Sequence, residues 1–284
     1  MRAAWGKACD AATDDGVGRE RMRARGGDWR PGRLRTGVGW AKLGGGVKAL
    51  PRVVLVDLDD TVLRYGAGGE GLWLEVVEGF AARLVVPPAR LLEALAAVRE
   101  PFWADPERSR LARQDMFAAR RTILAQAFGR LGLSPESELV REVADAYSSE
   151  REARVAPFPG ALEALAALRR RGHALGLLTN GGARLQRAKI ERYELARFFD
   201  VVRIEGETGV GKPESAAFAG ALAALGAAGE PALMIGDDLH VDVVGASQAG
   251  LATVWVDHAG AGPPARGVRP DRVVRTLAEV VPSD

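Results

Sequence analysis

The sequence predicts an α/β fold: a doubly wound, Rossmann-like parallel sheet with an all-helical segment inserted after its first strand. Two observations predict it. Short apolar runs that end in polar residues alternate with helical patterns along most of the chain, and residues 71–155 hold helical patterns without a convincing strand. With 284 residues, of which 47% are hydrophobic, the chain is long enough for one large domain or two modest ones.

Five apolar runs are expected to form the strands of this sheet. The first, residues 52–59 (RVVLVDLD), is continuous rather than alternating, which is typical of a buried parallel strand. The others span residues 173–180, 199–204, 231–238 and 251–256. Helical patterns lie between them, at 161–171, 184–193, 215–225 and 241–249. Ligands bind beyond the carboxyl ends of such strands, where the polar residues of these runs fall.

The inserted segment is predicted to hold four helices, at residues 72–86, 88–99, 108–131 and 135–151. Pro135, after Ser134, is expected to open the last of them, because proline fits the first helical position. An insertion directly after the first strand and its turn has to lie over the carboxyl end of that strand. We therefore expect residues 71–155 to form a helical cap, and residues 50–70 and 156–284 to form the α/β core.

Residues 1–49 are expected to be an unstructured extension. They are rich in glycine and arginine, lack helical or strand periodicity, and hold 11 lysines and arginines against 5 acidic residues. A nucleic-acid-binding arm is the alternative for such a tail, but we expect no specific nucleic-acid partner. The rest of the chain has 28 basic and 32 acidic residues, so the formal net charge of +2 comes from this tail.

Composition excludes several classes of protein. The single cysteine, Cys9, permits no intrachain disulfide and no cysteine-based metal site, which suits a reducing cytoplasm. No apolar run approaches the roughly 20 residues that cross a membrane, and the N-terminus lacks the apolar core of a signal peptide. We therefore predict a cytoplasmic protein that does not associate with membranes.

The stretch IEGETGVGKPES at residues 204–215 has the spacing of a nucleotide-binding P-loop at Gly206, Gly211 and Lys212. The next position of such a loop needs a hydroxyl for Mg²⁺ and a backbone N–H at the start of the following helix. Pro213 supplies neither. The lysine therefore needs another explanation.

Two acidic clusters follow predicted strands. Asp57 and Asp59 lie two residues apart, so they start on one face of the first strand and emerge together at its end. Neighbouring buried carboxylates repel each other unless a cation compensates them, and Mg²⁺ prefers such oxygen ligands. The second cluster, Asp237, Asp238 and Asp242, ends the fourth strand and is a candidate to complete the coordination. Taken alone, either cluster is equally compatible with a solvated strand end or a helix N-cap.

Four motifs stand in order at predicted strand ends or in the loops that follow them: D-x-D-x-T at 57–61, L-L-T-N at 177–180, G-K-P at 211–213 and G-D-D-x-x-x-D at 236–242. This set resembles the phosphatase branch of the haloacid dehalogenase superfamily of hydrolases, over residues 52 to about 257. The position of the helical insertion, between the first two motifs, matches the type 1 cap of that family. Lys212 matches its third-motif lysine, so the P-loop spacing is coincidental.

The resemblance implies a role for each motif residue. Asp57 would be the nucleophile and form an aspartyl-phosphate. Asp59 would protonate the leaving alkoxide and then deprotonate the attacking water. Thr179 and the backbone at Asn180 would bind phosphoryl oxygens, and Lys212 would offset charge on the nucleophile and the phosphate.

The resemblance also implies a Mg²⁺ cofactor. Its ligands would be Asp57, the backbone carbonyl of Asp59, and Asp237. Asp238 and Asp242 are alternative candidates for a residue that does not bind the metal itself but contacts its ligands.

Other polar residues carry weaker indications. Thr61 is expected to buttress the turn after the first strand, although a purely structural role fits equally well. Arg108, Arg110 and Arg113 are candidates to contact an anionic or sugar portion of a substrate, but a solvated helix face is the preferred interpretation. The histidines, at positions 173, 240 and 258, lack metal-ligand spacing and are assigned no chemistry.

The resulting expectation is a Mg²⁺-dependent phosphatase that hydrolyses a small phosphorylated metabolite. Three alternatives stay open. A 2-haloacid dehalogenase of the same superfamily also uses an aspartate nucleophile, but such enzymes lack a carboxylate at the position of Asp59 and need no metal, so Asp59 and Asp237 argue against it. A phosphomutase would use the same two aspartates with a different cap. A phospho-receiver signalling domain also combines aspartates, threonine and lysine, but the large insertion and Asp59 argue against it.

Overall fold

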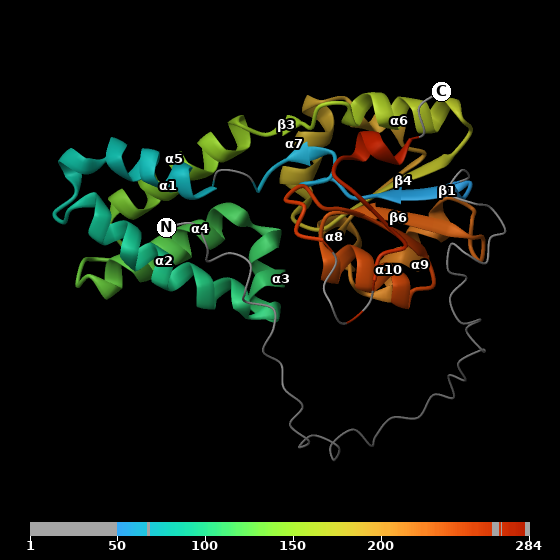
Figure 1. Ribbon diagram of the computed structural model, residues 1–284. Helices are drawn as coiled ribbons and strands as arrows, with labels where there is room; N and C mark the ends of the chain where they lie inside the picture. Colours follow the sequence, from blue (N-terminus) through green and yellow to red (C-terminus); the bar gives the residue numbers. More distant parts are fainter. Residues whose placement is uncertain (1–49, 67–68, 263–266, 268, 282–284) are drawn as a thin grey trace, which may run out of the picture. The chain divides into compact units, whose positions relative to one another are not determined.

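Residues 50–66, 69–262, 267 and 269–281 are described by the computed structural model (Figure 1). They form a parallel six-stranded sheet with helices on both faces, together with a second group that is all helical. The predicted α/β class and the Rossmann-like sheet are confirmed. The predicted extension, residues 1–49, lies outside the described residues.

The sheet has the strand order β5-β4-β1-β6-β7-β8, and every neighbouring pair is parallel. Its strands are β1 (Val53–Val56), β4 (Ala174–Thr179), β5 (Val201–Ile204), β6 (Ala232–Gly236), β7 (Ala252–Val256) and β8 (Arg272–Val274). In the middle lies β1, where Val53 is in register with Ala174 of β4 on one side and Ala232 of β6 on the other. The chain builds outward from β1 to β4 and β5 before it crosses to β6, so the topology reverses at β1.

Helices cover both faces of the sheet: α6 (Ala161–Arg170), α7 (Ala183–Arg192), α9 (Ser215–Ala224) and α10 (Gly245–Gln248). Val54 and Val56 of β1 share an apolar cluster with α6 and α7. Val53 and Leu55 share another with α9 and α10. Figure 1 shows α6 on one side of the sheet and α9 and α10 on the other. Because both faces are covered, all four residues of β1 are buried, which explains an apolar sequence without alternation.

The second group consists of α1 (Gly69–Gly79), η2 (Ala81–Arg83), α2 (Pro88–Ala104), α3 (Pro106–Gln114), α4 (Met116–Arg130) and α5 (Glu138–Ala153). It has an apolar cluster of its own, in which Trp73 stacks on Tyr147 with ring centroids 3.7 Å apart. The prediction of a single helix over 108–131 is wrong. Asp115 interrupts it, because its carboxylate accepts hydrogen bonds from the N–H groups of Phe117 and Ala118 and so caps α4.

The ends of the other helices of this group also differ from the prediction. The first ends at Gly79 rather than at residue 86. The second continues through Pro101 to Ala104, where the buried side chain of Phe102 keeps it packed. The last begins at Glu138 instead of Pro135, with Ser137 extended before it.

Several short elements complete the chain. The two-residue strands β2 (Leu63–Arg64) and β3 (Ala156–Pro157) pair antiparallel, so the connections into and out of the helical group lie side by side. The short helices are η3 (Leu195–Phe198), α8 (Glu205–Thr208), η4 (Leu239–Val244) and η5 (Leu277–Val280). The predicted helix 241–249 is a π-helix, η4, followed by α10. Within the described part of the chain, no helix is long and apolar enough to cross a membrane.

Candidate active site

The carboxyl ends of three adjacent strands bring motif residues together. Asp57 follows β1, Thr179 is the last residue of β4, and Asp237 follows β6. Because β1 lies between β4 and β6, these residues gather at the point where the topology of the sheet reverses. The backbone N–H of Asp57 donates to the carbonyl of Ile235 at 2.9 Å, which continues the ladder between β1 and β6 past the end of the strand.

Asp57 and Lys212 form a buried ion pair. The ammonium of Lys212 donates to Asp57 Oδ1 at 2.5 Å and to Asp242 Oδ1 at 2.7 Å, and all three side chains are buried. Burial raises the pKa of Asp57 to about 7, with Lys212 acting in the opposite direction. Burial alone lowers the pKa of Lys212, but the carboxylates of Asp242 and Asp57 outweigh it, so that pKa is raised. The lysine therefore stays charged and offsets one of the two negative charges that it contacts.

Three carboxylates converge at this point. Asp57, Asp237 and Asp242 each offer an oxygen, and these oxygens lie within 4.8 Å of one another. Burial, and next to it the charge of Asp57, raises the pKa of Asp237 to about 9. Burial also raises the pKa of Asp242. If all three acids were ionised, one lysine would leave an excess of negative charge. Hard oxygen donors at this spacing suit a divalent cation that would offset it, so the donor set fits the expected Mg²⁺.

Two neighbours hold Asp237. The hydroxyl of Thr61, which is fully buried, donates to Asp237 Oδ1 at 3.5 Å. The indole N–H of Trp255 donates to the backbone carbonyl of Asp237 at 2.7 Å. Thr61 therefore reaches the acidic cluster from the turn that it was expected to buttress.

Asp238 and Asp242 have different places. The carboxylate of Asp238 caps the start of η4, where it accepts hydrogen bonds from two backbone N–H groups at 2.8 Å. Asp242 is 1% exposed and accepts from Lys212 and from the N–H of Asp238. Among the described residues, only Asp242 of these two belongs to the acidic cluster. Gly236 makes room for it, since a Cβ there would lie 2.2 Å from Asp242 Oδ2.

Asp59 has surroundings of its own. Lys189 Nζ donates to both oxygens of its carboxylate at 2.9 Å, and Gln186 Nε2 donates to Oδ2 at 3.0 Å. Gln186 Nε2 also donates to Thr179 Oγ1 at 2.7 Å and to the carbonyl of Asn180 at 3.1 Å. One glutamine thus joins the expected acid–base residue to the expected phosphate ligand Thr179.

The sequence analysis overlooks Gln186 and Lys189. Both lie on α7 and both are buried, at 3% and 5% exposure. Their spacing is the signal that points to them. With Ile190 they form the i, i+3, i+4 pattern of the buried face of a helix, so an amide and an ammonium stand where apolar side chains are expected. A buried lysine requires a partner, but nothing in the sequence identifies Asp59 as that partner.

Asn180 fixes the loop that carries Lys212. Its side-chain amide donates to the carbonyl of Lys212 at 2.7 Å and accepts from the N–H of Lys212 at 2.8 Å. Gly211 permits this close approach, because a Cβ there would lie 2.9 Å from Asn180 Oδ1. The side chain of Asn180 is therefore engaged, and the expected phosphate contact at this position depends on its backbone.

The turn after β1 is held on two sides. Asp60 has a positive φ of 57°, and its carboxylate accepts hydrogen bonds from the N–H groups of Tyr65 and Gly66. A ring nitrogen of His258 donates to the carbonyl of Asp60 at 2.8 Å, and this ring stacks on Phe158. His258, to which the sequence assigns no chemistry, therefore supports the turn that presents the two aspartates.

The three arginines of α3 differ in their surroundings. Arg108 and Arg110 form exposed ion pairs with acidic residues three positions earlier, which is the expected solvated helix face. Arg113 lies near the end of the helix, and its carbonyl accepts from the N–H of Gly182 at 2.9 Å. The helical group therefore contacts the loop that follows Thr179.

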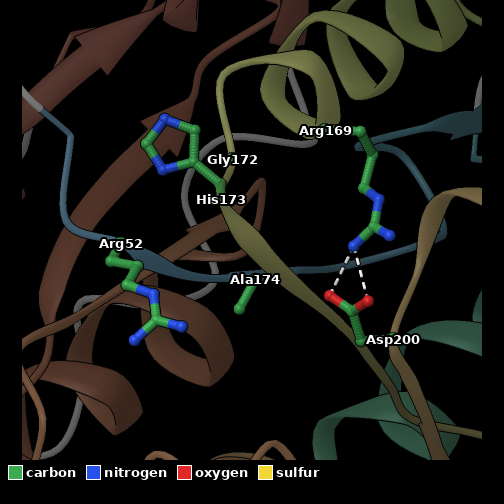
Figure 2. A pocket seen from close by; sticks show the side chains of 6 residues that line it. All are labelled: Arg52, Arg169, Gly172, His173, Ala174 and Asp200. Atoms are coloured by element: carbon green, nitrogen blue, oxygen red, sulfur yellow. Dashed lines mark hydrogen bonds and ion pairs between the residues drawn. The ribbon is translucent and has the colours of Figure 1, made fainter.

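A polar pocket of about 390 Å³ lies at the amino ends of the strands, where β1 and β4 begin (Figure 2). Its lining residues are Arg52, Arg169, Gly172, His173, Ala174 and Asp200. Figure 2 shows Arg169 facing Asp200, and its Nη1 lies 2.5 Å from both carboxylate oxygens. The motif carboxylates follow the other ends of the same strands, so this pocket is not the candidate active site.

Comparison with known proteins adds to this geometry. A family model described as haloacid dehalogenase-like hydrolase matches residues 51–250. A phosphoserine phosphatase of Thermus thermophilus is 37% identical over 246 residues, which cover 81% of this chain and 97% of that relative.

Solved structures show the same fold. The HAD-hydrolase YfnB of Bacillus subtilis, bound to magnesium, matches with a TM-score of 0.62 at 21% identity, over 82% of this chain and 97% of that one. A 2-haloacid dehalogenase of Pseudomonas syringae pv. Tomato matches with a TM-score of 0.55 at 24% identity, over 82% of this chain and 96% of that one. At these identities the likeness extends to the fold alone.

Proposed function

The chain belongs to the haloacid dehalogenase-like hydrolases, and on that premise we propose that it is a Mg²⁺-dependent phosphatase that hydrolyses a small phosphate monoester through an aspartyl-phosphate on Asp57. The observation that carries the proposal is the pair of carboxylates after β1. Asp57 lies among buried acids with one lysine, whereas Asp59 lies beside Gln186 and Lys189. Two carboxylates in different surroundings suit two different chemical roles.

The two aspartates divide the reaction between them. In the first half, an oxygen of Asp57 attacks phosphorus, the ester P–O bond breaks, and Asp59 gives a proton to the leaving alkoxide. In the second half, Asp59 takes a proton from a water molecule as the water oxygen attacks phosphorus. The bond between phosphorus and the Asp57 oxygen then breaks, and inorganic phosphate is released.

Other groups stabilise the phosphoryl group in this proposal. Lys212 contacts Asp57 Oδ1 at 2.5 Å, so its charge lies where negative charge develops. The Thr179 hydroxyl accepts a hydrogen bond from Gln186, but as a donor it makes a long contact, 3.3 Å, with the Asn180 carbonyl, so its proton is free to turn toward a phosphoryl oxygen. Mg²⁺ held by Asp57, the Asp59 carbonyl and Asp237 would neutralise charge on the phosphate and the nucleophile.

The surroundings of Asp59 favour a phosphate ester over a carbon–halogen bond. A halide ion leaves without a proton, whereas an alkoxide is a strong base that needs one. A carboxylate held beside the nucleophile therefore serves ester hydrolysis and has no such task in dehalogenation. The relative named phosphoserine phosphatase, which matches over 81% of this chain, supports the same choice.

A panel of phosphate monoesters, with phosphoserine first, tests the proposal in the presence of Mg²⁺ and of EDTA. We expect inorganic phosphate to be released with Mg²⁺ and the rate to fall to background in EDTA. Assays for halide release from 2-haloacids and for isomeric phosphate products address the dehalogenase and phosphomutase alternatives. Halide release without phosphate release, or an activity that EDTA leaves intact, would contradict the proposal.

We also propose that residues 71–155 act as a cap that excludes bulk water from this site. Three hydrogen bonds with the core support this role. The N–H of Gly182 donates to the carbonyl of Arg113, the Tyr65 hydroxyl donates to Glu152 at 3.0 Å, and Arg120 donates to the Tyr65 hydroxyl at 2.8 Å. Replacing residues 71–155 by a short linker should change selectivity among small substrates more than Mg²⁺ affinity, measured by calorimetry. An unchanged substrate profile would show that the segment has another role.

A further inference from the structure

We propose that Lys189 and Gln186 are positioning residues, which hold the Asp59 carboxylate in one place and orientation and thereby set where the proton is given and taken. The inference deepens the proposed function and rests on it, because it concerns the acid–base part of that reaction. The observation behind it is that two residues outside the four motifs lie against the Asp59 carboxylate. A buried amide and a buried ammonium, 127 and 130 residues away in sequence, both donate to the Asp59 carboxylate.

The contacts occupy both oxygens of the carboxylate. Lys189 Nζ lies 2.9 Å from Oδ1 and 2.9 Å from Oδ2, and Gln186 Nε2 lies 3.0 Å from Oδ2. A cation that bridges the two oxygens, with a second donor on one of them, fixes the carboxylate plane as well as its position. The Asp59 side chain is 25% exposed, so part of it stays accessible to a reactant.

The orientation of the Gln186 amide follows from the same contacts. Its Oε1 lies 3.0 Å from Lys189 Nζ, and an ammonium has no lone pair to accept with, so the carbonyl end must face the lysine. The NH₂ end therefore faces Asp59 and Thr179. Because the Thr179 oxygen accepts this hydrogen bond, one side chain orients the proposed acid–base residue and the proposed phosphate ligand together.

Stability alone does not explain these two residues. An ion pair in the interior gains little over apolar side chains of similar volume, because both charges lose hydration. Lys189 contacts Asp59, Gln186 and the ring of Tyr65, whose centroid is 3.6 Å from Nζ. Except for Gln186, these partners belong to residues 59–65, the segment that follows β1 and contains β2. The buried face of α7 is thus directed at that segment.

Position matters for proton transfer because the rate falls steeply with misplacement. An error of about 1 Å in a reacting group can lower a rate about 100-fold. Asp59 lies beyond the end of β1 and forms an isolated bridge with Leu63, so contacts from other elements are needed to fix its side chain. Lys189 and Gln186 supply them.

Lys189→Met tests the proposal, since methionine has a similar length and no donor. We expect phosphoserine turnover to fall about 10- to 100-fold, whereas phosphorylation of Asp57 by p-nitrophenyl phosphate, whose leaving group needs little protonation, should change much less. Rapid-quench measurement of the phosphoenzyme gives both rates. Arg187→Met is the matched control, because Arg187 lies on the same helix and pairs with Glu207 instead.

The double variant Lys189→Met with Asp59→Asn gives the decisive comparison. If Lys189 acts through Asp59, adding Lys189→Met to Asp59→Asn should lower the rate no further. The proposal would be overturned if the rate losses of the two single variants multiplied in the double variant. It would also be overturned if Lys189→Met slowed phosphorylation of Asp57 equally with phosphoserine and with p-nitrophenyl phosphate. Gln186→Met removes a donor to Thr179 as well as to Asp59, so phosphorylation by both substrates should slow and that by phosphoserine should slow more. This variant takes the place of Lys189→Met if thermal unfolding shows that Lys189→Met is misfolded.

The wild-type measurements keep this inference separate from the proposed function. Absence of phosphate release and of phosphoenzyme in the wild type would refute the proposed function itself. Suppose instead that the wild type forms phosphoenzyme and that the Lys189 and Gln186 variants lose activity equally with good and poor leaving groups. That result would refute only the positioning role.

Discussion

Asp57 and Asp59 stand two residues apart in one turn, yet the structure surrounds them in opposite ways. Around Asp57 are two more aspartates and one lysine, so full ionisation of the three acids would leave an excess of negative charge. Around Asp59 are one lysine and one glutamine, and both donate hydrogen bonds to its carboxylate. The difference indicates where a divalent cation is needed and where it is not. It also supports the separate chemical roles that we propose for the two carboxylates.

Asp57→Asn should produce the largest loss of activity. It tests whether Asp57, and not Asp59, is the nucleophile. Without a carboxylate nucleophile no phosphoenzyme can form, so turnover should fall to background, about 10⁴-fold or more. Rapid-quench trapping of phosphoenzyme measures this. Asp238→Asn is the control, because Asp238 only caps η4 and asparagine caps as well as aspartate. Phosphoenzyme in the Asp57→Asn variant would refute the assignment.

Asp59→Asn should remove acid–base assistance and leave the nucleophile in place. General acid–base catalysis contributes about 10² to 10⁴ in rate, so hydrolysis of alkyl phosphates should fall by that range. Aryl phosphates should still phosphorylate Asp57, and the phosphoenzyme should accumulate because its hydrolysis lacks a base. Burst kinetics with both substrate types would show this. An equal loss in the phosphorylation step for alkyl and aryl substrates would mean that the two carboxylates do not divide the work.

Gly236→Ala should disturb the Asp57 side alone. Its Cβ would lie 2.2 Å from Asp242 Oδ2, so Asp242 must shift away from Lys212. Such overpacking costs about 1 to 3 kcal/mol in the free energy of unfolding, and Mg²⁺ affinity should fall with it, as denaturant titration and calorimetry would measure.

Gly129→Ala is the matched control for this change. Gly129 lies within α4, and a Cβ there meets no atom within 4 Å among the described residues. Alanine should therefore be neutral or stabilising by up to about 1 kcal/mol. If Gly236→Ala altered the ratio of alkyl to aryl rates, the two sides of the site would not be independent.

The polar residues at strand ends are the part of the site that the sequence predicts well. Apolar runs that end in acids or in threonine place Asp57, Thr179 and Asp237 at one edge of a parallel sheet, whatever the details of packing. Gln186 and Lys189 escape prediction because their partner is remote in the chain, and a helical pattern does not say what its buried face meets.

Helix ends and short strands show the same limit. Asp115 stands inside a helical pattern, and only its hydrogen bonds to Phe117 and Ala118 reveal that it caps a new helix. The strand β8 has three residues, too few to show a period. Local pattern therefore predicts the central strands of the fold, but it does not distinguish an aspartate inside a helix from one whose carboxylate caps the start of the next helix.

Replacing Asp200, which lies at the amino ends of the strands, should have the smallest effect of these changes. We expect it to alter stability and not activity. Burial raises the pKa of Asp200, but the N–H of Leu175 and the guanidinium of Arg169 outweigh it and the pKa is lowered. A lowered pKa means that the contribution to stability is present above the unfolded value of about 3.9 and is lost as pH falls through the folded value. Because solvent screens an ion pair whose side chains are more than a third exposed, Asp200→Asn should cost at most about 1 kcal/mol at pH 6 and less at pH 3, by urea unfolding.

Activity provides the control for that variant. Asp200 lies at the starts of the strands, so kcat at pH 7 should stay within about twofold of wild type once the protein is folded. A larger change in kcat would show that the two edges of the sheet are coupled.

The contact between α3 and the loop after β4 depends on backbone atoms on the helical side. The carbonyl of Arg113 accepts from Gly182, and a Cβ on Gly182 would lie 2.1 Å from the carbonyl oxygen of Gln114. Any residue type at positions 113 and 114 presents the same carbonyls, whereas position 182 admits only glycine. A helical group taken from a relative should therefore keep this contact whatever its side chains at positions 113 and 114, whereas the contacts of Tyr65 with Glu152 and Arg120 depend on side chains and would have to be carried over with it.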